Sequence, residues 1–152
     1  PSADQFLADA RQVAAHADVP TSQLISYGFS VGAIPAVEMA PTDEVCALVL
    51  EAPYSSIAEV AQARMPLMPV RRLLLDHYDS KSKIADVAAP LLILHGARDG
   101  TIPVRFGEKL FAAASEPKQI QIYPEAGHND LYDHGMGRLT VDFLKASIPS
   151  AS

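Results

Sequence analysis

Ser30 lies midway between Gly28 and Gly32, and this spacing is typical of a serine that attacks a carbonyl carbon. Such a serine sits on a sharp strand-to-helix turn, where the backbone approaches itself so closely that a Cβ at either flanking position would collide with it. An apolar run at 24–27 precedes the pattern, and a helix-compatible run at 33–40 follows it. The sequence therefore predicts a strand, a turn that exposes the Ser30 hydroxyl, and a helix.

A serine nucleophile needs a base to take its proton and an acid to orient that base. Asp99 follows the apolar run 91–94, and His128 follows the alternating run 119–123. The carboxyl ends of parallel strands meet at one edge of a sheet, so residues that each follow a strand are expected to converge there. We therefore predict that Ser30, Asp99 and His128 act as nucleophile, acid and base.

Each of these assignments has an alternative. Ser30 could be a helix cap, and Asp99 could only brace its own glycine-containing turn. Glu51 follows another apolar run and could orient the histidine in place of Asp99, while His134 is the alternative to His128 as the base. Replacing the two histidines separately would decide between them.

Three other polar residues near these loops are expected to have structural roles. His95 ends a buried run and is expected to form a hydrogen bond within the Asp99 loop. The short side chains of Asn129 and Asp130 suit bracing of a turn or capping of the last helix. Because the sequence contains no close-spaced metal signature, we expect no metal, and the proposed chemistry requires no organic cofactor.

The elements that must position these residues alternate along the chain, which predicts an α/β fold with a parallel sheet and helices on both faces. The continuous apolar runs suit strands that are buried on both faces, and the alternating run suits an edge strand. Helices are expected at 4–17, 31–40, 103–114 and 132–146, helical pieces within 56–78, and strands at 24–27, 45–50, 91–95 and 119–123.

Four segments carry a resemblance to a known family: Tyr27–Gly32, Glu51–Ser56, Leu94–Pro103 and Ala126–Asp130. Together they resemble an α/β-hydrolase of the compact type that includes esterases and acyl-protein thioesterases. The resemblance implies a serine hydrolase that forms an acyl-enzyme with a small or medium acyl ester or thioester. It also implies that the N–H of Val31, directly after Ser30, is one oxyanion-hole donor.

About four strands are visible, which is fewer than the family's sheet contains, so 1–152 is expected to be one domain that lacks its amino-terminal strands. The resemblance places the second oxyanion donor in that missing part. Loss of one donor lowers turnover by about 10²–10³. An uncovered edge strand could also pair with a second copy of the chain. The alternative function is therefore an impaired hydrolase-like module that needs a partner chain.

Composition sets further limits. The 152 residues are 49% hydrophobic and 20% charged, which suits one globular domain, and a net charge of −6 argues against a nucleic-acid partner. The apolar runs are shorter than the ~20 residues of a membrane span, so a cytoplasmic location is expected. Cys46 is the one cysteine and is expected to pack as a small hydrophobe.

A segment between two of the predicted strands could contact an acyl chain. It contains Met65–Pro69 and the apolar face of Leu73, Leu74 and His77. Methionine adapts to irregular apolar shapes, but ordinary helix packing is the favoured interpretation of this face.

Overall fold

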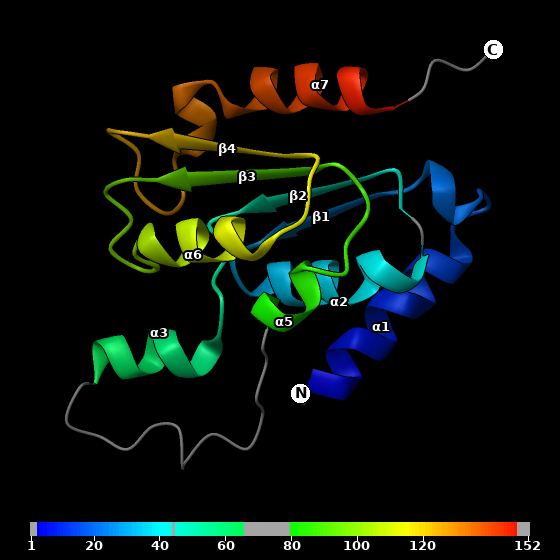
Figure 1. Cartoon of the computed structure of the whole chain (residues 1–152), viewed down its shortest axis with the longest axis horizontal. Coiled ribbons are helices and arrows are strands. Elements are labelled where there is room, and N and C mark those ends of the chain that lie inside the picture. Colours follow the sequence, from blue (N-terminus) through cyan, green and yellow to red (C-terminus); the bar gives the residue numbers. More distant parts are fainter. Residues whose placement is uncertain (1–2, 44, 66–79, 149–152) are drawn as a thin grey trace.

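The sheet is parallel and follows the order of the chain. The computed structural model describes residues 3–43, 45–65 and 80–148, and within them four strands pair in the order β1-β2-β3-β4 (Figure 1). Every strand pair is parallel, so all four carboxyl ends lie at the same edge of the sheet. The strands are β1 (Ile25–Phe29), β2 (Ala47–Glu51), β3 (Leu91–Gly96) and β4 (Lys118–Tyr123).

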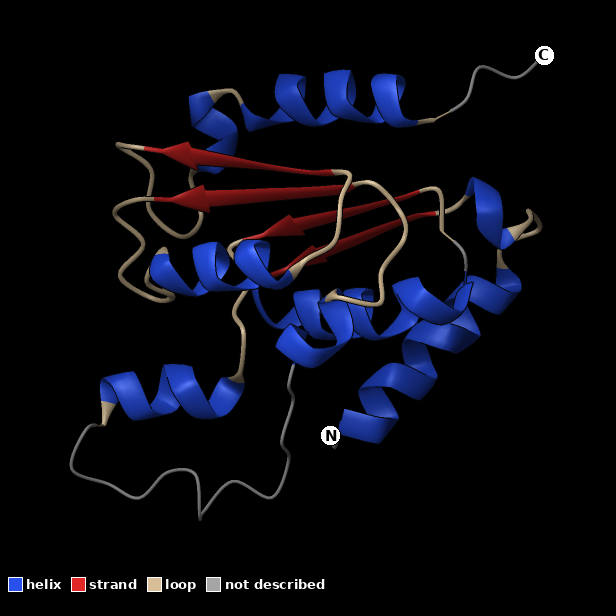
Figure 2. Cartoon of the chain, in the orientation of Figure 1, coloured by secondary structure: helices blue, strands red, loops and turns tan. Residues whose placement is uncertain are grey.

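Helices cover both faces of the sheet (Figure 2). Helix α7 lies over one face, and α2, α5 and α6 lie over the other. This arrangement confirms the fold class predicted from the sequence. The helices are α1 (Ala3–His16), α2 (Ala33–Asp43), α3 (Ile57–Arg64), α5 (Ser80–Ile84), α6 (Arg105–Ala113) and α7 (Met136–Ser147), with short 3₁₀ helices η1 (Thr21–Gln23), η2 (Ser30–Gly32) and η3 (Leu131–His134).

The two central strands are buried on both faces, as their continuous apolar runs predicted. Successive side chains of a strand point to opposite faces. Leu48 and Leu50 of β2 therefore pack against the α2 side, while Val49 between them packs against the α7 side. In β3 all six residues, 91–96, are buried. The alternating strand β4 lies at an edge of the described sheet, also as predicted.

Two predicted helices are each divided in the structure. The segment predicted as helix 31–40 begins with η2 and continues as α2, and the segment predicted as 132–146 consists of η3 and α7. Gly135 separates η3 from α7 with a φ of 88°, a left-handed conformation that ends a helix and that glycine adopts readily. Of the helical pieces predicted within 56–78, α3 is present, and residues 66–79 lie outside the described part of the chain.

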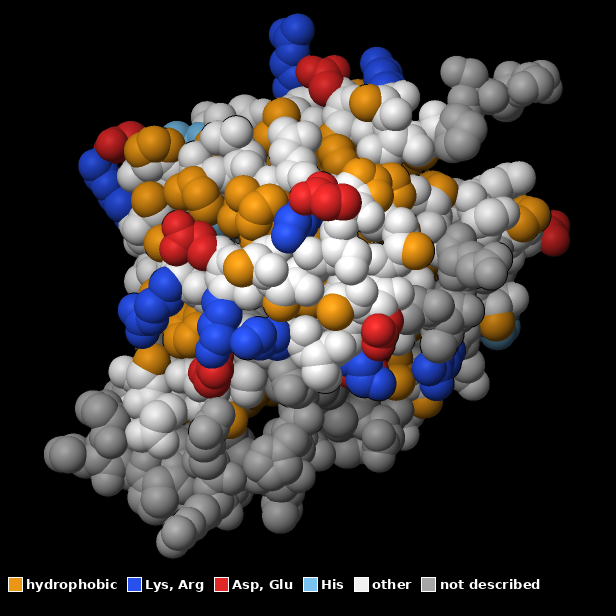
Figure 3. All heavy atoms as spheres, viewed as in Figure 1, with side chains coloured by type: hydrophobic (Ala, Val, Ile, Leu, Met, Phe, Trp, Pro, Cys, Tyr) orange, Lys and Arg blue, Asp and Glu red, His pale blue; other side chains and the backbone are white. Residues whose placement is uncertain are grey.

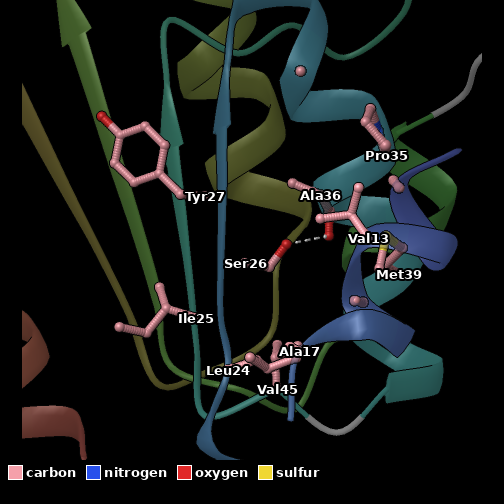
Figure 4. Close-up of a pocket in the computed structure, with 13 residues that line it drawn as sticks. Val13, Ala17, Leu24, Ile25, Ser26, Tyr27, Pro35, Ala36, Met39 and Val45 are labelled. Atoms are coloured by element: carbon pink, nitrogen blue, oxygen red, sulfur yellow. Dashed lines mark hydrogen bonds between the residues drawn. The ribbon is translucent and has the colours of Figure 1, made fainter. Parts of the chain in front are cut away.

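Strand β1 forms the other edge of the described sheet and exposes large apolar side chains. Ile25, Tyr27 and Phe29 are 39%, 46% and 39% exposed. A cavity of about 390 Å³ lies between α1, β1 and α2, with Val13 and Met39 among its apolar lining residues (Figure 4). The β1 side of the molecule is therefore less completely packed than the centre of the sheet.

The surface charges are mixed. On the face drawn in Figure 3, acidic and basic side chains lie close to one another instead of forming a separate basic stripe. No helix in 3–43, 45–65 or 80–148 is long and apolar enough to cross a membrane. The thiol of Cys46 is half-buried and donates a hydrogen bond to the Leu24 carbonyl at 3.0 Å, so it is packed as predicted but also has a polar partner.

Candidate active site

The three predicted residues converge at the carboxyl edge of the sheet. Ser30 directly follows β1, Asp99 lies in the loop after β3, and His128 lies in the loop after β4. His128 Nε2 is 3.2 Å from Ser30 Oγ, and His128 Nδ1 is 2.7 Å from Asp99 Oδ2. These distances allow a continuous hydrogen-bonded chain from the hydroxyl through the ring to the carboxylate.

Ser30 occupies a strained backbone position. Its φ is 52°, in the left-handed region that residues other than glycine adopt uncommonly. The turn is tight because Gly28 meets the start of α2: a Cβ on Gly28 would lie 2.6 Å from both Ala33 Cα and Gly32 O. Strained residues of this kind cluster at functional sites, and here Oγ of the strained residue lies 3.2 Å from His128 Nε2.

The second glycine of the pattern does not have the predicted role. A Cβ on Gly32 would meet no described atom within 4 Å, so the prediction that it would collide with nearby backbone is wrong. The reason is that the turn folds back on its strand side, where Gly28 faces Ala33, whereas position 32 faces open space. Of the two glycines, only Gly28 has a steric explanation in the described structure.

Asp99 is held by its own loop. Its side chain is fully buried, and its Oδ1 accepts hydrogen bonds from the backbone N–H groups of Thr101 and Ile102, both at 2.7 Å. Asp99 thus braces its turn and also reaches His128. Because a carboxylate only accepts, His128 Nδ1 must carry the proton, and Nε2 is then free to accept the Ser30 hydroxyl proton.

Neither alternative from the sequence, Glu51 as the acid or His134 as the base, lies in the hydrogen-bonded chain. The Glu51 carboxylate accepts a hydrogen bond from the Tyr27 hydroxyl at 2.5 Å, whereas the His128 ring turns to Asp99. Burial, and then the neighbouring Glu51, raise the pKa of Tyr27, so this hydroxyl keeps its proton as a donor. His134 lies exposed in η3, and the ring beside Ser30 is that of His128.

The loop that carries His128 has its own supports. Asp130 Oδ1 accepts a hydrogen bond from the Gly127 N–H at 2.6 Å, which confirms that Asp130 braces this turn, while Asn129 is exposed. The ring of Phe29 lies 5.2 Å from the His128 ring, centroid to centroid, at an interplanar angle of 38°. Our sequence reasoning missed Phe29, although its place directly before Ser30 was a signal that it lies beside the site.

His95 has the predicted hydrogen bond within the Asp99 loop. It is fully buried, and its Nε2 lies 2.9 Å from the carbonyl oxygen of Ile102. Burial is the main cause that lowers the pKa of His95, so the ring is neutral near pH 7. Among the described residues, no group of three or more His, Cys, Asp or Glu side chains could hold a metal ion.

The chain is similar in sequence to several known proteins. No family model matches the chain. Over 151 residues it is 41% identical to the uncharacterized protein Rv2307c of Mycobacterium tuberculosis, covering 95% of this chain and 53% of that protein. Over 112 residues it is 31% identical to alpha/beta hydrolase domain-containing protein 17B of Homo sapiens, covering 74% and 38% of the two chains.

Solved structures share the fold at lower sequence identity. The esterase domain of a Rhodothermus marinus protein superposes with a TM-score of 0.71 at 20% identity, covering 95% of this chain and 68% of that one. The chain spans about half the length, or less, of the curated relatives that it matches.

Proposed function

Since this chain belongs to the α/β-hydrolase superfamily, we propose that it is a serine hydrolase that cleaves carboxylic esters or thioesters through an acyl-enzyme. The observation that carries the proposal is the chain of contacts from Ser30 Oγ through His128 to Asp99, at 3.2 and 2.7 Å. The esterase activity named for the Rhodothermus marinus domain supports the same class of substrate.

In the first half of the reaction, Ser30 Oγ bonds to the carbonyl carbon while its proton passes to His128 Nε2. Asp99 holds Nδ1–H and stabilises the imidazolium that forms. The N–H of Val31, directly after Ser30, donates to the oxyanion. The imidazolium then protonates the leaving alcohol or thiol as the C–O or C–S bond breaks, and the acyl group remains on Ser30.

In the second half, water attacks the acyl carbon while His128 Nε2 takes one of its protons. The Ser30 ester bond breaks, the proton returns to Oγ, and a carboxylic acid is released. Because Nε2 must be unprotonated to act as a base, acidification is expected to lower the rate.

The range of substrates and the location of the protein are part of the proposal. A small or medium acyl group is the proposed acid part of the substrate, and the net charge of −6 argues against nucleic acid as a partner. A cytoplasmic location remains a prediction from the sequence, and fractionation of cells that produce the protein would test it.

The direct test is covalent labelling by a fluorophosphonate probe together with hydrolysis of p-nitrophenyl acetate and butyrate. We expect labelling and hydrolysis in the unaltered chain and in Ser115→Ala, which removes an exposed hydroxyl that precedes the amino end of β4 and donates to the Ala85 carbonyl, and neither in Ser30→Ala. Equal labelling or hydrolysis in a folded Ser30→Ala variant would contradict the proposed nucleophile.

The exposed side of β1 favours a second candidate function, an impaired hydrolase-like module completed by a second copy of the chain. Within the described residues β1 pairs only with β2, and an unpaired strand edge with exposed Ile25 and Tyr27 invites a further strand. Light scattering after gel filtration separates the two functions. A folded dimer that takes no probe and becomes monomeric in Ile25→Lys supports the module, and a labelled monomer supports the enzyme.

A further inference from the structure

We propose that His95 is a positioning residue that holds the Asp99 carboxylate in line with His128. This inference rests on the proposed function, because it assigns His95 a role through Asp99 rather than through contact with substrate. His95 stands near the end of β3, four residues before Asp99, and approaches Oδ2 of that carboxylate, whereas the loop N–H groups bind Oδ1.

The His95 ring meets both ends of the acid loop. Its Nε2 lies 2.9 Å from the carbonyl oxygen of Ile102 and 3.4 Å from Asp99 Oδ2. Asp99 Oδ2 is the same oxygen that His128 Nδ1 approaches at 2.7 Å. One carboxylate oxygen therefore lies between two imidazole rings, one facing the nucleophile and one facing the core.

The protonation of the His95 ring follows from its neighbours. The Ile102 carbonyl and the Asp99 carboxylate only accept, so Nε2 must carry the proton. Nδ1 is buried and has no hydrogen-bond partner among the described residues, so a second proton there would be left without an acceptor. The ring is thus a neutral single donor whose N–H is directed at the acid loop.

Helix α6 prevents this ring from turning away. Gly107 lies within α6, and a Cβ there would come within 2.4 Å of His95 Nδ1. Glycine is less favourable than alanine inside a helix, and this close approach gives a reason for glycine at 107. The backbone of α6 packs on one edge of the ring while the other edge faces Asp99.

Ile102 provides a second, indirect connection between the His95 ring and the Asp99 carboxylate. The Ile102 N–H donates to Asp99 Oδ1 at 2.7 Å, while the Ile102 carbonyl accepts from His95. The hydrogen bond from His95 therefore fixes the residue that holds the other oxygen of Asp99. If that bond is lost, the turn can rotate and move Oδ2 out of line with His128, which would slow proton transfer without changing the contacts to substrate.

Two substitutions separate this role from simple packing. Glutamine can place its amide nitrogen near the position of Nε2, whereas asparagine places its amide nitrogen near that of Nδ1. We expect His95→Gln to retain most of the kcat for p-nitrophenyl butyrate. We expect His95→Asn to lose about 10²-fold in kcat at unchanged KM, the scale of a misplaced catalytic group. Thermal unfolding of each variant checks that it is folded.

A double-mutant cycle tests whether the effect passes through Asp99. If His95 acts only by orienting that carboxylate, His95→Asn should have almost no further effect on kcat in an Asp99→Asn background. An equal and additive loss in both backgrounds would show that His95 acts elsewhere and would overturn the proposal.

A nitrogen-15 NMR spectrum of the histidine rings supplies a readout that needs no catalysis. We expect a proton on Nε2 of His95 and on Nδ1 of His128. The signal of the hydrogen-bonded Nδ1–H of His128 should be kept in His95→Gln and lost in His95→Asn. If His95→Asn does not fold, Gly107→Ala displaces the ring and should lose the same signal. A folded His95→Asn or Gly107→Ala variant that retains the signal overturns the positioning role. An unaltered chain with the expected signals but no labelling refutes the hydrolase proposal alone.

Discussion

The two sides of the candidate site are built differently. On the acid side the two polar side chains are buried: His95, near the end of β3, is 0% exposed and Asp99, in the loop that follows, is 6% exposed. The nucleophile side, on β1 and η2, is open, with Tyr27 46% and Val31 55% exposed. The candidate site therefore joins a buried, hydrogen-bonded carboxylate to a strained turn on an edge strand.

This difference arises from the order of the strands. β3 lies between β2 and β4 and is covered on both faces, so the side chains up to its carboxyl end are buried. β1 is held by β2 on one side and by α2 beneath. Changes on the acid side should thus act through buried polar groups, and changes on the β1 side through the shape of the backbone.

The largest expected effect is that of Asp99→Asn on the acid side. The amide can still accept from Thr101 and Ile102, so the fold should persist, but its NH₂ group favours the wrong tautomer of His128. We expect kcat for p-nitrophenyl butyrate to fall by about 10⁴-fold. Asp142→Asn, at an exposed position of α7, is the control and should leave kcat unchanged. A fall of less than tenfold would mean that the buried carboxylate is not the acid of the site.

On the nucleophile side, Gly28→Ala and Gly32→Ala form a matched pair. The new Cβ at 28 would lie 2.6 Å from backbone atoms that cannot easily move, whereas the one at 32 would meet open space. We expect Gly28→Ala to lower the free energy of unfolding by about 1–3 kcal/mol, as overpacking does, and to slow probe labelling of Ser30. Urea unfolding measures the first effect. Equal destabilisation by both changes would contradict the assignment of the close contact to Gly28.

The buried histidine predicts a smaller effect that depends on pH. Because burial lowers the pKa of His95 from 6.5, the unfolded chain takes up a proton below that pH which the folded chain excludes. The free energy of unfolding should therefore fall as the pH drops below 6.5, with a slope of at most about 1.4 kcal/mol per pH unit from this group. His95→Gln should flatten this part of the curve, and His134→Gln, at an exposed site, should not. If the free energy of unfolding depends on pH in the same way in His95→Gln and in the unaltered chain, this prediction is wrong.

The convergence of the three residues could be predicted from the sequence. Continuous apolar runs identified β2 and β3, and the chain order of Ser30, Asp99 and His128 after strands identified the three residues that meet. Chain order and strand ends suffice there because parallel strands bring their carboxyl ends together whatever the details of packing.

Features that depend on one dihedral angle or on contacts between distant elements could not be predicted. The segment predicted as helix 31–40 begins within the 3₁₀ turn η2, whose first residue, Ser30, has a positive φ. The contact of Gly107 with His95 depends on how α6 packs on β3, and the open space at Gly32 depends on which way the turn folds. The helix α5 has five residues, too few for an apolar period to show.

The smallest expected effect is that of Tyr27→Phe on the exposed side of β1. This change removes the hydroxyl that donates to Glu51. Because water can replace a donor at a half-exposed position, the free energy of unfolding at pH 7 should fall by less than about 1 kcal/mol.

The same hydroxyl predicts an effect at alkaline pH. Burial and Glu51 raise the pKa of Tyr27, so the folded chain keeps a proton above pH 10 that the unfolded chain loses. The free energy of unfolding should therefore decline as the pH rises past 10. Tyr27→Phe should weaken that alkaline decline, whereas Tyr132→Phe, at a 75% exposed position, should not. Urea unfolding at pH 7 and pH 10.5 measures both. A loss at pH 7 as large as that of Gly28→Ala would show that a polar side-chain contact stabilises β1 as much as the shape of its backbone does, and the contrast between the two sides would fail.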